Sequence, residues 1–67
     1  MTKIQMLLME IITLDGAEWG DIVTHFRDQK IKITNWHKVR AELQQLIESG
    51  LVYKIMQHKS EIYVRTT

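Results

Sequence analysis

The sequence contains no cysteine and no proline, and only three glycines. Without cysteine the chain can form neither a disulfide nor a Cys/His zinc site, so a domain of this size depends on its apolar core or on a partner chain. The absence of cysteine also agrees with a reducing compartment, and we expect a cytoplasmic protein.

Long hydrophobic runs are also absent. The longest run spans residues 6–9, and Glu10 interrupts the apolar N-terminal segment, whereas a membrane-spanning helix needs about 20 apolar residues. No small-residue cleavage site follows this segment, so we expect neither a signal peptide nor a membrane anchor. The sequence has 67 residues, begins with Met1 and shows no linker composition, and we expect one complete domain over residues 1–67.

Motifs for catalysis and metal binding are missing as well. The sequence has no nucleophile elbow, no phosphate-binding glycine loop and no clustered pair of carboxylates. His25, His37 and His58 are 12 and 21 residues apart, which matches no compact set of metal ligands. We therefore expect no enzymatic activity, no metal or other cofactor, and no small-molecule substrate.

Apolar residues recur at the spacing of an amphipathic helix in three segments, and we expect helices over residues 2–14, 18–29 and 34–49. Their apolar faces consist of Ile4, Leu7, Leu8, Ile11 and Ile12, then of Trp19, Ile22, Val23 and Phe26, and finally of Trp36, Val39, Leu43, Leu46 and Ile47. Trp19 and Trp36 lie on these faces. We interpret both as core residues rather than as stacking platforms for single-stranded nucleic acid.

Residues that begin and end helices lie at the boundaries of these segments. Thr2 is a suitable N-cap for the first helix, and Thr34 or Asn35 is suitable for the third. Asp15-Gly16 is typical of a turn. Gly50 is the expected end of the third helix, because glycine readily adopts the left-handed conformation that ends many helices.

The composition changes from helix formers to strand formers after Gly50. Residues 51–56 and 61–65 are rich in β-branched and aromatic side chains, and the polar residues 57–60 lie between them. We expect a β-hairpin over residues 51–65 with a four-residue loop. The expected fold is therefore α+β, with three helices followed by a two-stranded hairpin.

Charge is unevenly distributed along the chain, although the net charge is only +1. Residues 1–24 carry a net charge of −3, residues 25–40 carry +4, and residues 41–67 are balanced. The first segment has Glu10, Asp15, Glu18 and Asp21 against Lys3, and the second has Arg27, Lys30, Lys32, Lys38 and Arg40 against Asp28. A concentrated positive segment is typical of a surface that binds a polyanion, and the alternative is an ordinary solvated surface.

A longer motif joins the third helix to the hairpin. Val39, Leu43, Leu46, Gly50, Leu51 and Val52 form the pattern V-x3-L-x2-L-x3-G-L-V, and Tyr63-Val64 is an aromatic and aliphatic pair in the returning strand. With these residues the chain resembles the winged helix-turn-helix superfamily over nearly its whole length, and its length suits the small free-standing regulators of that group. The resemblance implies a recognition helix, a wing hairpin, and sequence-specific binding of double-stranded DNA to regulate transcription.

The third helix and the hairpin provide the candidate contacts to DNA. Opposite its apolar face the helix is polar and long-armed, which suits pairing with base edges in the major groove. The candidates on this helix are Asn35, His37, Lys38 and Ala41 for base edges, with Arg40 and Gln44 beside them at base or phosphate. The candidates for the DNA backbone or the adjacent minor groove are Gln57, His58 and Lys59 in the wing loop with Lys54 and Arg65 on the strands, and Lys30 and Lys32 before the helix are candidates for phosphate.

The main alternative is a winged helix that contacts another protein and not DNA, because a fold does not determine a function. Lysines and arginines near the third helix and the loop favour DNA, whereas Glu42 and Glu48 dilute this charge. Asn35 invites comparison with winged helices that bind left-handed DNA, but the chain lacks the prolines that their wings use.

A single module of this size binds DNA modestly, so we also expect a homodimer or another protein partner. Met1, Met6 and Met9 of the first helix are the candidate surface for it, since methionine adapts to irregular apolar contacts.

Overall fold

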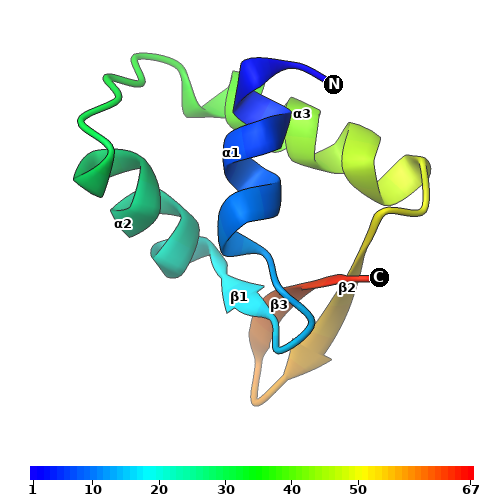
Figure 1. Ribbon diagram of the computed structural model, residues 1–67. Coiled ribbons are helices and arrows are strands. Elements are labelled where there is room, and N and C mark those ends of the chain that lie inside the picture. Colours follow the sequence, from blue (N-terminus) through cyan, green and yellow to red (C-terminus); the bar gives the residue numbers. More distant parts are fainter.

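The computed structural model describes all 67 residues and shows three helices packed on one side of an antiparallel sheet (Figure 1). The elements are α1 (Lys3–Ile11), β1 (Ala17–Glu18), α2 (Trp19–Asp28), α3 (Trp36–Glu48), β2 (Val52–Gln57) and β3 (Ser60–Arg65). The domain is therefore α+β, and the three helices predicted from the apolar spacing are confirmed. None of these helices combines the length and the apolarity needed to cross a membrane.

The sheet contains a third strand that the sequence pattern did not predict. Residues 17–18 form β1, which pairs with β3 so that Ala17 lies opposite Tyr63 and Glu18 opposite Ile62. Two residues are too few to show a period-two pattern, so this strand is defined by its partner rather than by its own sequence. Gly16, with φ +93°, leads the chain into β1 and packs so closely on β3 that a Cβ atom would lie 2.8 Å from Cγ2 of Ile62.

The helix boundaries follow local capping interactions. The Thr2 side chain accepts a hydrogen bond from the Gln5 N–H, which confirms the predicted N-cap of α1. The predicted end of α1 at residue 14 is wrong, because the helix stops at Ile11 and extended backbone begins at Ile12. Ile12, the residue that ends the helix, is fully buried and is the last core residue of this segment.

The remaining helices begin at the residues that cap them. Glu18 is the N-cap of α2, and its N–H donates to Asp21 Oδ2 at 3.0 Å. Asn35, rather than Thr34, is the N-cap of α3, and its side chain accepts a hydrogen bond from the His37 N–H at 3.1 Å. Gly50 follows α3 with φ +83°, as expected for the residue that ends it.

The hairpin loop is shorter than the four residues expected. Gln57 pairs with Ser60, so only His58 and Lys59 remain unpaired, and both have positive φ angles of 51° and 67°. A two-residue loop with this backbone matches the right-handed twist of the strands that it joins. The left-handed conformation costs about 1–2 kcal/mol for a residue other than glycine, and strand pairing on both sides offsets this cost.

The core lies where the inner sides of the three helices meet the sheet. It consists of Leu8, Ile12, Ala17, Ile22, Phe26, Val39, Leu43, Leu46, Val52 and Tyr63. Trp19 and Trp36 pack against this core while keeping part of each ring exposed, and their rings meet edge to face with centroids 5.9 Å apart. The two rings therefore join α2 to α3 at the edge of the core.

We expect Gly16→Ala to lower the free energy of unfolding by about 1–3 kcal/mol, because alanine strains the left-handed backbone and its Cβ meets Ile62. Gly20→Ala is the matched control, because Gly20 lies in α2 with open space around it. This control should raise the free energy of unfolding by about 0.5–1 kcal/mol. Urea denaturation measures both effects, and similar shifts for the two variants would contradict the constraint at Gly16.

Candidate nucleic-acid interface

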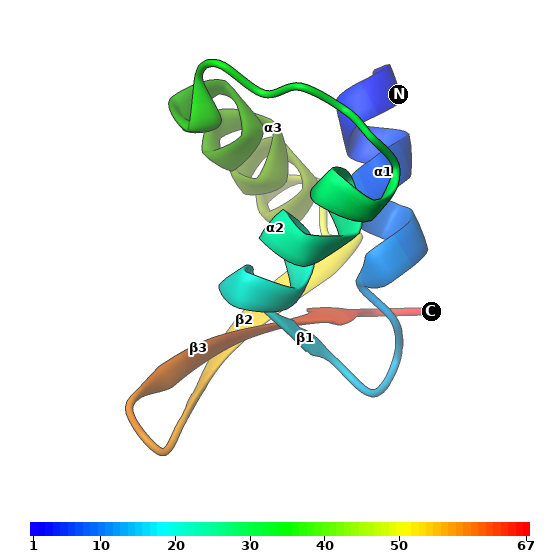
Figure 2. The same ribbon diagram turned by 90° about the vertical axis from the view of Figure 1, so that its left-hand side faces the viewer.

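Helix α3 and the hairpin lie on the same side of the molecule, opposite α1. Figure 2 shows α1 on the right and α3 with the hairpin tip on the left, and the hairpin projects beyond the helices. A helix and a projecting hairpin that share one side can contact the same extended ligand.

The exposed side of α3 carries the residues that were expected to point outward. His37, Lys38, Arg40, Ala41 and Gln44 are all exposed. These residues face outward because the opposite side of α3, with Val39, Leu43 and Leu46, is buried in the core.

One flank of α3 is occupied by α1. Thr2 Oγ1 donates to Glu42 Oε2 at 3.0 Å, and Gln5 Nε2 donates to Gln45 Oε1 at 3.1 Å. Glu42 and Gln45 are therefore engaged with α1. Arg40 lies away from these contacts, over Trp19 of α2, and lines a cavity together with residues of the hairpin.

Asn35 has a structural role that its assignment to base edges did not include. Its Oδ1 atom accepts the hydrogen bond that caps α3, so this oxygen is occupied. The exposed side chain keeps its amide group for a further contact.

A cavity of about 180 Å³ lies between α3 and the hairpin. Its lining consists of Arg40, Leu43, Gln44 and Ile47 from α3 and of Lys54, Glu61 and Tyr63 from the hairpin. The structure thus brings together three candidate residues, Arg40, Gln44 and Lys54, that are up to 14 positions apart in the sequence. The Arg40 guanidinium lies over the Trp19 ring, 4.1 Å from its centroid, and this cation–π contact restrains a side chain that lines the cavity.

Tyr63 and Glu61 belong to this cavity, and the sequence analysis assigned neither of them to a site. The Tyr63 hydroxyl donates to Glu61 Oε2 at 3.0 Å, and Lys54 Nζ lies 3.8 Å from Glu61 Oε1. Burial, and then the hydrogen bond and negative charge of Glu61, raise the pKa of Tyr63 above its ordinary value, while the positive charge of Arg40 opposes the rise. The alternation of side chains along a strand could have indicated from the sequence that these residues share a site, because it places Lys54, Glu61 and Tyr63 on one face of the hairpin.

No protein-family model, curated protein or solved structure matches the chain. The arrangement of α3, the hairpin and the cavity between them is therefore the basis for a proposal about function.

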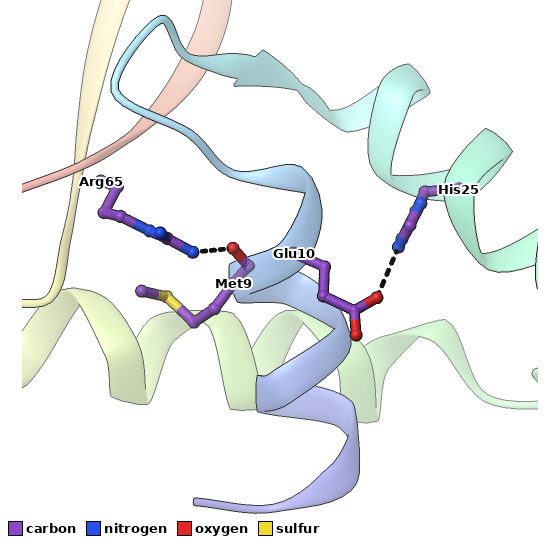
Figure 3. Close-up of polar contacts among 4 residues, drawn as sticks. All are labelled: Met9, Glu10, His25 and Arg65. Atoms are coloured by element: carbon purple, nitrogen blue, oxygen red, sulfur yellow. Dashed lines mark hydrogen bonds and ion pairs between the residues drawn. The ribbon is translucent and has the colours of Figure 1, made fainter.

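The other candidate residues lie at three different places. Gln57, His58 and Lys59 are exposed at the hairpin tip, and Lys30 and Lys32 are exposed in the connection between α2 and α3. Arg65 does not join them. It lies at the end of β3 away from the tip, and its guanidinium donates a hydrogen bond to the Met9 carbonyl of α1 (Figure 3). The expected role of Arg65 in contacting the DNA backbone is replaced by a role in tying the sheet to α1.

The largest hollow, of about 420 Å³, lies between α1, β1 and α2 and contains none of the candidate residues. Asp21 and Asp28 line it together with His25, whose Nε2 lies 3.2 Å from Glu10 Oε2 (Figure 3). Negative charge around this hollow disfavours contact with a polyanion.

We expect the free energy of unfolding to fall as the pH rises above 10, the ordinary pKa of tyrosine. Because the folded state raises the pKa of Tyr63, it holds this proton more tightly than the unfolded chain. The resulting stability is present below pH 10 and is lost as the pH rises through the folded pKa. Urea denaturation between about pH 8 and about pH 12 should show a smaller decline for Tyr63→Phe than for the wild type. Tyr53→Phe, which removes an exposed phenol, should keep the wild-type decline, and identical profiles for both variants would contradict the assignment.

Proposed function

We propose that the protein binds double-stranded DNA in a sequence-specific manner through α3 and the hairpin, and that it regulates transcription in this way. The observation that carries this proposal is that α3 and the projecting hairpin lie on one side of the molecule (Figure 2), and that the polar residues of α3 are exposed. Both elements carry exposed positively charged residues, which are Lys38 and Arg40 in α3 and Lys59 at the hairpin tip.

The dimensions of the two elements suit duplex DNA. The major groove is about 12 Å wide and admits one helix, and the N-terminal part of a recognition helix enters deepest. His37, Lys38 and Ala41 lie in this part of α3, and all three are exposed. The hairpin would then contact the DNA backbone beside the groove, which positions the protein without reading sequence.

The winged-helix interpretation agrees with three helices followed by a hairpin, and we include it in the proposal. One departure is the connection between α2 and α3, which spans residues 29–35 and is longer than the three or four residues of a helix-turn-helix. In this connection Lys30 directly follows the last turn of α2, where its N–H donates to the Arg27 carbonyl, and Lys32 lies nearer to α3 in the sequence; both are exposed.

An exposed methionine surface on α1 favours protein contact in addition to DNA binding. Met1 and Met6 are 69% and 57% exposed, and with Met9 they line a hollow of about 250 Å³ that contains no residue of α3 or of the hairpin tip. A homodimer or another protein bound there would leave α3 and the hairpin free for DNA. Two copies would compensate for the modest affinity expected of one module.

The proposal predicts salt-sensitive binding to a random duplex that depends on α3. Between about 50 and 200 mM salt, five or six phosphate contacts would give a slope of log affinity against log salt of roughly −4 to −5. Lys38→Glu should weaken binding by at least about tenfold at the lower salt concentration, because it places a negative charge against the DNA. Lys3→Glu is the matched control, since it makes the same charge change at an exposed position of α1.

Fluorescence anisotropy with a labelled duplex measures both affinities. Equal losses for Lys38→Glu and Lys3→Glu would mean that binding follows net charge and not the α3 face. If folded wild-type protein does not bind at the lower salt concentration, the proposal is wrong, and the protein-interaction function takes its place.

A further inference from the structure

Glu61 lines the cavity between α3 and the hairpin and lies next to a hydrogen-bond donor and a positive charge. One of its carboxylate oxygens accepts a hydrogen bond from Tyr63, and the other lies near the ammonium group of Lys54. Arg40 lines the same cavity and lies close enough for its charge to act on the Tyr63 hydroxyl. A site built from an ammonium, a guanidinium and a hydroxyl group is suited to an anion, and in the free protein the anion is this carboxylate.

The contact between Lys54 and Glu61 is weak enough to be exchanged. Their charged atoms are 3.8 Å apart, which is too far for a hydrogen bond, and both side chains are nearly half exposed at 46% and 45%. Ion pairs of this kind contribute little to stability, because water and salt screen them. Lys54 can therefore leave the carboxylate for another anion at low cost.

The position of the cavity determines which part of the DNA would reach it. A helix in the major groove and a hairpin beyond the edge of that groove must lie on either side of one DNA strand. The phosphates of that strand would then pass between α3 and the hairpin, where the cavity lies.

We propose that the cavity binds a backbone phosphate of duplex DNA and that Glu61 occupies the place of this phosphate in the free protein. This inference rests on the proposed function. In the complex, Lys54 and Arg40 pair with the phosphate and the Gln44 amide donates a hydrogen bond to it, while the Glu61 carboxylate turns out to solvent. Glu61 thus competes with DNA for Lys54 and lowers the affinity for any duplex.

A double-mutant cycle of Glu61→Gln and Lys54→Gln tests this competition. Glu48→Gln is the matched control, because Glu48 is exposed on α3, makes no ion pair or side-chain hydrogen bond, and lies outside the cavity. At about 50 mM salt we expect Glu61→Gln to tighten binding to a random duplex about threefold to tenfold and Glu48→Gln by less than about twofold. In the Lys54→Gln background, the gain from Glu61→Gln should fall to that of the control.

Two results would overturn the inference and leave the proposed function intact. Equal gains from Glu61→Gln and Glu48→Gln would show that only net charge matters. A gain from Glu61→Gln that persists without Lys54 would show simple repulsion between the carboxylate and the DNA, with no exchange. Circular dichroism confirms that each variant is folded before its affinity is compared.

Inorganic phosphate tests the cavity without DNA. At constant ionic strength, phosphate in place of chloride should raise the melting temperature of Glu61→Gln more than that of Glu48→Gln, because the vacated site binds the anion. Equal shifts would overturn the anion site. If the protein responds to phosphate but binds no duplex, both the proposed function and the assignment of the cavity to DNA are overturned. The cavity would then be assigned to another phosphate-bearing ligand.

Discussion

The burial of one side of α3 is the constraint on which the rest of the structure depends. Val39, Leu43 and Leu46 are at most 2% exposed, and each contributes about 1.5–3 kcal/mol by leaving water. Turning the helix about its axis would expose them, so their burial fixes which residues face outward. Lys38 and the other outward residues of α3 are exposed to solvent because the opposite side is held in the core.

The sheet determines where the hairpin stands relative to α3. Pairing of β3 with both β1 and β2 holds the hairpin against the helical core at one end, while its tip projects beyond the helices (Figure 2). Tyr63 is the central residue of this arrangement, since it lies between Ala17 and Lys54 in the sheet and is buried against the helices. The same residue orients Glu61 through its hydroxyl, so core packing and the polar groups of the cavity share one side chain.

Arg40 connects the two tryptophans to the cavity. Its guanidinium rests on Trp19, whose ring packs edge to face against Trp36 at the start of α3. The aromatic contact between α2 and α3 therefore supports a positive charge at the face that we assign to DNA. An arginine held in this way loses less conformational entropy on binding an anion than a freely moving side chain.

The sequence by itself determined the elements whose signals are local. The apolar spacing located the three helices, Thr34 or Asn35 and then Gly50 marked the ends of α3, and strand-forming residues after Gly50 located the hairpin. The polar side of α3 followed from the same spacing, because a helix with one buried side exposes the other. These predictions succeeded since each depends on residues within a few turns of one another.

Only the tertiary structure decided the features that join distant residues. β1 exists because residues 17–18 meet Tyr63 and Ile62, and Arg65 leaves the candidate interface because it meets Met9 of α1. The cavity also depends on such contacts, since it brings Arg40 to the hairpin face that carries Glu61. The spacing of residues along the chain does not predict these contacts, because they depend on how the helices and strands pack in space.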